Sequence, residues 1–99
     1  MQYLIFLEDL PGSETARAER LQEHLRFVQT HLDRILVAGP RLASGGEMIG
    51  STYIIEADSL EEAQGFLQQD PYWHANIWRE PQISGFSGVA GRWVGGVNW

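Results

Sequence analysis

The chain has 99 residues and a formal net charge of −6 at pH 7, because 13 acidic side chains outnumber 7 basic ones. This length allows one compact domain and excludes an enzyme with a separate cofactor-binding lobe. The acidity argues against nucleic acids and anionic membranes as partners, since their phosphate groups would meet a repulsive field. The chain contains no cysteine, which excludes disulfides, thiolate catalysis and cysteine-bound metal.

The first part of the chain predicts a strand followed by a helix. Residues 3–7 are apolar at every position, as in a strand covered on both faces, and Pro11-Gly12 closes it. A helix is expected over residues 14–32, with Ser13 as its N-cap. Apolar side chains at helical spacing predict one buried stripe on this helix, made of Leu21, Leu25, Val28 and Leu32.

Two further strands and a loop are expected next. Residues 35–38 form a second strand that is again apolar on both faces and ends at Gly39-Pro40. Residues 41–50 are expected to form a loop. A third strand, rich in Thr, Tyr and Ile, is expected over residues 51–57.

A second helix is predicted by the capping box of Ser59 and Glu62. It should end near Gln69, because the proline two residues later disfavours helix at the residue before it. The fourth strand is expected over residues 77–86, and Pro81 within it places this strand at a sheet edge or a bulge. The buried positions of the second helix are expected at Leu60, Ala63 and Leu67.

The element order β-α-β-β-α-β matches the ferredoxin-like arrangement of the α+β class, a four-stranded antiparallel sheet with two helices on one face. Two helices cover only one face, yet the first two strands are apolar on both. The uncovered face needs a partner, and a second copy of the chain is the simplest one. We therefore expect a homodimer with its sheets packed face to face.

Residues 87–99 form a Gly- and Trp-rich C-terminal extension beyond the 1–86 domain. Two tryptophans exposed to water would be a liability, so we expect the extension to pack on the partner subunit. A flap over a ligand pocket is the alternative. No apolar run reaches the roughly 18 residues of a membrane span, and the N-terminus lacks the features of a signal peptide. We therefore expect a cytoplasmic protein.

Several segments resemble the YCII-related family of small dimeric α+β proteins, over residues 1 to about 86. The resemblance implies the ferredoxin-like dimeric α/β barrel. Its segments are His24-Leu25, Val37-Ala38-Gly39-Pro40, Gly50-Ser51, Glu56-Ala57-Asp58-Ser59-Leu60-Glu61-Glu62-Ala63 and Asp70-Pro71-Tyr72.

The resemblance also implies that His24 and Asp70 form an active-site pair. At least one member of the family resembles a dehydrochlorinase acting on a chlorinated hydroxyquinol, and the related fold also hosts muconolactone isomerase. Three features depart from the family pattern. Asn76 stands where members commonly have Gly, the chain between His24 and Ala38-Gly39-Pro40 is slightly short, and the C-terminal extension is additional.

The residues themselves leave two interpretations of this pair open. His24 lies about 70° from the centre of the apolar stripe at 100° per residue, so it either faces a cleft or is a partly exposed structural residue. A carboxylate from Asp70 would fix its tautomer and stabilise the imidazolium that a general base forms. Asp70 is equally suited to cap the turn that follows it. Both roles are compatible if one carboxylate oxygen serves each.

The remaining candidates are weaker. Ser51 could place a hydroxyl at the mouth of the cleft as a substrate-binding residue. His31 lies about 10.5 Å along the helix from His24, too far to share a metal ion, and His74 is expected at the surface or pocket rim. No phosphate-binding glycine motif and no nucleophilic serine motif is present. We expect no metal and no cofactor.

Two functions from different classes follow. The first is a cofactor-independent enzyme, of a lyase or isomerase type, in which His24 and Asp70 transfer a proton on a phenolic, quinol-like or lactone substrate. The second is a non-catalytic homodimer that binds a small molecule or acts as an accessory protein.

Overall fold

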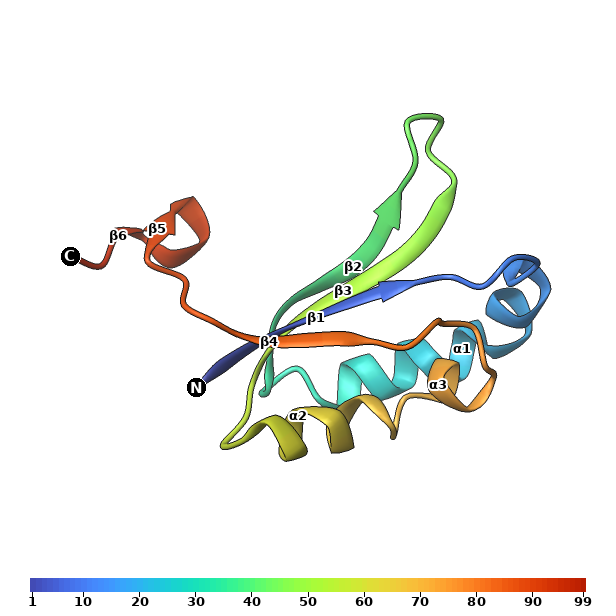
Figure 1. The fold of residues 1–99 in the computed structure, drawn as a ribbon, viewed down its shortest axis with the longest axis horizontal. Coiled ribbons are helices and arrows are strands. Elements are labelled where there is room, and N and C mark those ends of the chain that lie inside the picture. The colour runs from blue at the N-terminus through green and yellow to red at the C-terminus, as the bar shows by residue number, and fades with distance from the viewer.

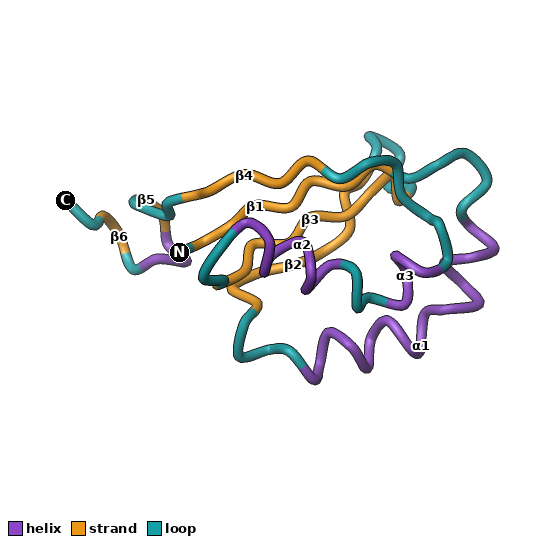
Figure 2. Tube along the Cα trace, turned by 60° about the horizontal axis from the view of Figure 1, so that its bottom comes forward, coloured by secondary structure: helices purple, strands orange, loops and turns teal.

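A computed structural model describes residues 1–99 as an α+β fold (Figure 1). Four strands form one antiparallel sheet in the order β2-β3-β1-β4, and the three helices lie on one face of it (Figure 2). No helix of the chain is both long and apolar enough to span a membrane. The elements are β1 Gln2–Glu8, α1 Glu14–Thr30, β2 Ile35–Leu42, β3 Met48–Glu56, α2 Leu60–Leu67, α3 Pro71–His74 and β4 Gln82–Phe86.

The core lies between the sheet and the helices. Alternate residues of β1 point toward the helices, because side chains change face at every residue of a strand. Tyr3, Ile5 and Leu7 are buried and pair with three residues of β3 on the same face. These β3 residues are Ile55, Tyr53 and Ser51, and the helices add Phe27, Ala63, Phe66, Leu67 and Tyr72 to the core.

The prediction of a loop over residues 41–50 is wrong. Strands β2 and β3 run through most of it as a long hairpin, and only residues 43–47 connect them. Cross-strand pairing of Arg41 with Gly50 and of Leu42 with Met48 continues the ladder. Pro40 is tolerated because β2 is an edge strand, where a missing N–H breaks no second ladder.

Strand β4 lies at the other sheet edge, as Pro81 predicts, but it begins only at Gln82. Of the residues expected to precede Gln82 in this strand, Trp78 forms one isolated bridge, with Asp9. The second helix ends at Leu67, and a separate one-turn helix, α3, follows it. Residues 77–81 instead connect α3 to the sheet.

The N-terminus of α1 also differs from expectation. Ser13 has a helical backbone and makes no capping bond. Its hydroxyl donates to the carbonyl oxygens of Leu10 and Ile77. Ser13 therefore ties the start of α1 to two loops instead of satisfying the first amides of the helix. At the other end α1 stops at Thr30, two residues before the expected boundary.

The apolar stripe of α1 is not buried as expected. Only Phe27 of this helix is buried, whereas Leu21 and Leu25 are 41% and 46% exposed. Leu32 lies beyond the helix and is also exposed. On α2, Ala63 and Leu67 are buried but Leu60 is exposed.

The C-terminal extension projects from the end of β4, away from the helices (Figure 1). It contains two short strands, β5 Ala90–Gly91 and β6 Gly96–Val97, around a 3₁₀ turn at Arg92–Val94. Trp93 and Trp99 are 80% and 82% exposed. Within a single chain these two rings therefore have almost no covering surface.

Candidate functional site

The turn after α2 is built by Asp70. Its side chain accepts the Tyr72 N–H at 2.9 Å and so caps α3, while Pro71 occupies the first helical position. Proline suits that position because its fixed φ is helical and no amide hydrogen is needed there. The capping role that the sequence left open is therefore present. Asp70 is nevertheless 0% exposed, which is rare for a carboxylate without several partners.

His24 reaches this carboxylate from the middle of α1. Its Nδ1 lies 2.9 Å from Asp70 Oδ1, the same oxygen that accepts the Tyr72 amide. A carboxylate has no hydrogen to give, so Nδ1 is the donor, and in the neutral imidazole Nε2 keeps its lone pair. One oxygen thus serves both the cap and the histidine, unlike the division between two oxygens that we expected.

The His24 imidazole is also positioned by stacking on an aromatic ring. His24 stacks on Tyr72 with ring centroids 3.9 Å apart and planes within 3°. The Tyr72 hydroxyl donates to the Arg17 carbonyl oxygen at 3.0 Å, which anchors the stacked ring to α1. Burial raises the pKa of the Tyr72 hydroxyl, although the Arg17 charge opposes the shift. The His24 ring is therefore fixed in position before any ligand arrives.

Tyr53 is a site residue that the sequence did not indicate. Its hydroxyl donates to Asp70 Oδ2 at 2.7 Å from the centre of β3. Burial, the Asp70 charge and this hydrogen bond raise the pKa of Tyr53 well above its ordinary value. The hydroxyl consequently stays protonated and remains a donor. The buried carboxylate of Asp70 thus has three donors, one each from His24, Tyr53 and Tyr72.

We expect Tyr53→Phe to lower the free energy of unfolding at neutral pH by about 1–3 kcal/mol, because Asp70 Oδ2 loses its donor inside the core. The raised pKa of Tyr53 implies that its contribution is full below the unfolded value of about 10 and is lost as the pH rises above it. Urea denaturation at about pH 8 and about pH 11 therefore should show a smaller alkaline loss for Tyr53→Phe than for the wild type.

Tyr3→Phe is the matched control, because Tyr3 is buried on the same sheet face. It should change stability less than Tyr53→Phe at about pH 8, where the contribution of Tyr53 is full. Equal effects of the two variants would mean that the bond to Asp70 contributes nothing specific.

A cleft of about 290 Å³ lies beside His24, between α1 and the β2–β3 hairpin. Its helical wall includes Leu21, Leu25 and Val28, the stripe that was expected to be buried. Ala38 and Pro40 line the opposite wall. The expected apolar pattern therefore faces an open cleft within the single chain, and no residue of the C-terminal extension lines it.

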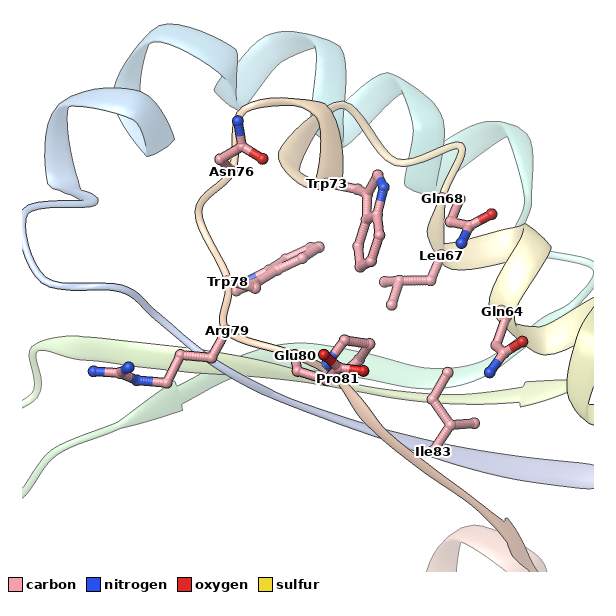
Figure 3. Close-up of a pocket in the computed structure, with 10 residues that line it drawn as sticks. All are labelled: Gln64, Leu67, Gln68, Trp73, Asn76, Trp78, Arg79, Glu80, Pro81 and Ile83. Atoms are coloured by element: carbon pink, nitrogen blue, oxygen red, sulfur yellow. The ribbon is translucent and has the colours of Figure 1, made fainter.

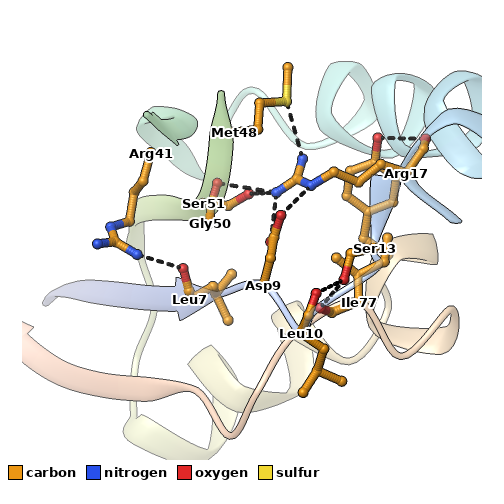
Figure 4. A network of polar contacts seen from close by, with 11 residues as sticks. Leu7, Asp9, Leu10, Ser13, Arg17, Arg41, Met48, Gly50, Ser51 and Ile77 are labelled. Atoms are coloured by element: carbon orange, nitrogen blue, oxygen red, sulfur yellow. Dashed lines mark hydrogen bonds and ion pairs between the residues drawn. The ribbon is translucent and has the colours of Figure 1, made fainter. Parts of the chain in front are cut away.

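Ser51 and Arg17 both line this cleft, and they belong to a network of polar contacts (Figure 4). The Arg17 guanidinium pairs with Asp9 through contacts of 2.8 and 3.0 Å, and its Nη2 donates to Ser51 Oγ at 3.0 Å and to the Gly50 carbonyl at 3.1 Å. Ser51, a predicted binding residue, thus lines the cleft but accepts a bond from Arg17. Arg17 itself was missed, although it lies seven residues before His24 on the same side of α1.

Glycine is required at position 50 by a close backbone approach. A Cβ at Gly50 would lie 2.1 Å from the Leu7 carbonyl oxygen and 2.7 Å from Arg41 Nη1. Any larger residue would push β3 away from β1. Gly50 therefore allows the neighbouring Ser51 to sit at the cleft beside Arg17.

The other histidines do not join the pair. His31 Nδ1 contacts the Phe27 carbonyl oxygen at 2.7 Å, and its ring packs against Phe27 and Phe66. His74 is exposed on α3. The structure contains no group of three or more His, Asp or Glu side chains that could hold a metal ion.

Comparisons with known proteins give one consistent result. The family described as "YCII-related domain" matches residues 1–87. An uncharacterized protein of Haemophilus influenzae is 32% identical over 97 residues, covering 90% of this chain and 99% of the relative. The protein YciI of Escherichia coli is 33% identical over the same length, with the same coverage.

A solved structure is also similar. It is the 5-chloro-2-hydroxyhydroquinone dehydrochlorinase of Burkholderia phenoliruptrix, in complex with 2,5-dihydroxybenzoquinone. Its TM-score is 0.82 at 30% identity, and the match covers 93% of this chain and 97% of the relative.

Proposed function

Because the chain belongs to the YCII-related family, we propose that it is a cofactor-independent enzyme that transfers a proton on a phenolic, quinol-like or lactone substrate. The observation that carries this proposal is the contact of His24 Nδ1 with buried Asp70, which leaves Nε2 as the free nitrogen of a residue that lines the cleft. A base needs this combination of a fixed tautomer, an open lone pair and a nearby anion.

The proposed step moves one proton. His24 Nε2 accepts it from a substrate hydroxyl, and the substrate oxygen keeps the bonding electron pair. The imidazolium that forms is stabilised by the Asp70 carboxylate, which keeps its own hydrogen bonds from Tyr53 and Tyr72. In an isomerisation, Nε2 returns the proton to another atom of the substrate. With a chlorinated hydroxyquinol, Nε2 returns it to the ring carbon that bears chlorine, chloride then leaves with the electron pair of the C–Cl bond, and a second hydroxyl gives its proton to water, so that HCl is lost in all. A general base of this kind contributes about 10²–10⁴-fold to the rate.

The walls of the cleft favour a flat ring as the substrate. Leu21 and Leu25 offer apolar surface, whereas Arg17 Nη1 contacts only the Met48 sulfur, at 3.6 Å. That nitrogen can donate to a substrate oxygen. The dehydrochlorinase relative, which was solved with a dihydroxybenzoquinone, supports the same substrate class.

Binding and turnover of such rings test the proposal. 2,5-Dihydroxybenzoquinone should raise the melting temperature, since a ligand at about 100 times its Kd adds about 2.7 kcal/mol. Chlorinated hydroxyquinols should be consumed with release of chloride, which an ion-selective electrode measures. Binding without turnover of any phenol, quinol or lactone would support the non-catalytic binding protein. The absence of both binding and turnover would contradict this substrate class.

We also propose that two chains assemble as a ferredoxin-like dimeric barrel through the open face of the sheet. Leu4 and Ile54 pair across β1 and β3 on the face opposite the helices, and both are only partly covered. Phe86, also on this face, is 41% exposed. A second copy would cover this apolar surface and offer the exposed tryptophans of the extension a place to pack.

Light scattering after size exclusion should therefore give about twice the chain mass of 11.2 kDa. Ile54→Asp should shift the protein to a monomer, because it places a charge in the buried centre of the interface. Leu60→Asp, at an exposed position on α2, is the control and should stay dimeric. A wild-type monomer would contradict assembly through this face.

A further inference from the structure

A second cavity lies on the other side of α3 from His24. It has a volume of about 290 Å³ and shares no lining residue with the His24 cleft. Residues of α2, α3, the connection to β4 and β4 itself surround it (Figure 3). The proposed proton transfer uses none of these residues, so the cavity needs an explanation of its own.

Two indole rings line this cavity. Trp73 projects from α3 and Trp78 from the connection (Figure 3). Trp78 is only 7% exposed and packs edge-on against Tyr72, with centroids 5.9 Å apart and an interplanar angle of 77°. Leu67 and Ile83 add apolar surface. This wall is therefore preformed by the core and does not depend on a ligand.

The indole of Trp78 also lowers the stability of the fold. Its Nε1 is buried without a hydrogen-bond partner. A buried donor left unpaired lowers stability, so an apolar ring such as phenylalanine would satisfy packing better. The larger indole face is the property that Trp78 adds to the cavity.

Two residues of opposite charge, Arg79 and Glu80, line the cavity. Of the charged residues that line it, Arg79 directs its guanidinium away from Trp73 and Leu67, whereas the Glu80 carboxylate lies at the cavity edge (Figure 3). Aromatic faces carry negative electrostatic potential. Two indole faces and one carboxylate therefore make the cavity favourable for a positive charge.

We propose that this cavity binds a small organic cation with a quaternary or tertiary ammonium head group, seated against Trp73 and Trp78 and balanced by Glu80. Such head groups are recognised by aromatic side chains because they combine a positive charge with an apolar, weakly hydrated surface. Anions are repelled by Glu80 and by the ring faces. Inorganic cations would need a cluster of ligands, and none is present.

Choline and 3,3-dimethyl-1-butanol test the proposal, because they have the same shape but only choline is charged. In ¹H–¹⁵N NMR titrations choline should shift the indole N–H signals of Trp73 and Trp78 in a saturable manner and bind about tenfold more tightly than the alcohol, about 1.4 kcal/mol. Trp93 and Trp99, exposed in the extension, serve as internal references and should not shift in the same way.

Two pairs of variants complete the test. Glu80→Gln should weaken choline binding severalfold, whereas Glu47→Gln, which removes the same charge from the connection between β2 and β3, should not. Trp73→Leu should abolish binding, whereas Trp93→Leu should leave it unchanged. If Trp73→Leu does not fold, the Glu80→Gln result and the choline-to-alcohol ratio still decide the matter.

The proposal is overturned if choline gives no saturable shift, if the alcohol binds equally well, or if Glu80→Gln and Glu47→Gln behave alike. His24→Ala should retain choline binding. A loss of the proposed enzymatic activity and a loss of cation binding are therefore separate outcomes.

Discussion

His24→Ala should lower kcat/KM toward a ring substrate by about 10²–10⁴-fold while leaving the protein folded. The imidazole is the only group that borders the cleft with both a fixed tautomer and a buried anion behind it. Its removal deletes the proton acceptor. It deletes little packing, because the ring lies at the cleft wall and Tyr72 remains held through its hydroxyl.

His74→Ala is the matched control, since His74 is exposed on α3 and lines neither the cleft nor the second cavity. It should keep wild-type turnover. Added imidazole should partly restore the activity of His24→Ala, because the vacated space can admit a free base. A loss smaller than about tenfold in His24→Ala, well below the contribution of a general base, would contradict the assignment.

Asp70 gives the second large effect, and two substitutions separate its roles. Asp70→Asn keeps an oxygen for the Tyr72 amide, and its amide group can donate to the Tyr53 oxygen, but the Tyr53 O–H loses its acceptor, so stability should fall by less than in Asp70→Ala. The negative charge behind His24 is lost, so kcat should fall strongly with a smaller effect on KM. Because His24 and Asp70 act as a unit, the double variant His24→Ala with Asp70→Asn should lose little more than either single one.

Asp70→Ala removes the oxygens altogether. Three donors, from His24, Tyr53 and Tyr72, then lose their acceptor at a position that is fully buried. We expect a loss of about 3–5 kcal/mol in the free energy of unfolding, the range for removing one partner from a buried, hydrogen-bonded ion pair. Urea denaturation followed by circular dichroism measures the difference.

The comparison of the two substitutions decides what Asp70 does. Near-normal turnover in Asp70→Asn would mean that Asp70 only caps the turn and that its charge does not assist His24. An equally large loss of stability in both variants would mean that the charge itself holds the core together.

Much of the site was predictable because its signals are local. The Ser59 half of the predicted capping box is present, since the Ser59 side chain accepts the Glu62 amide, whereas the Glu62 carboxylate contacts Arg34 instead of reaching back to Ser59. Asp70 before Pro71 predicted a capped turn, and the helical period placed His24 at the border of the apolar stripe. The family resemblance connected these two residues, which lie 46 positions apart.

Tyr53 and Arg17 were not predictable in the same way. Tyr53 lies in the predicted third strand, but nothing in the sequence said that its hydroxyl meets Asp70. Arg17 binds Asp9, Gly50 and Ser51 across as many as 34 positions. These contacts depend on how β1, β3 and α1 pack together, and no local sequence pattern predicts which residues of these elements meet.

The sequence by itself determined the α+β class and the order of the main elements, since these depend on periodicity and capping. For the last strand it left an edge or a bulge open, because a proline N–H is missing in either place. Only the tertiary structure decided that residues 41–50 continue a hairpin, that Leu21 and Leu25 face a cleft, and that Asp70 Oδ1 serves both the turn and His24. The physical reason is that hydrophobic patterns say which side chains avoid water, whereas the partner that covers them is set by packing between distant segments.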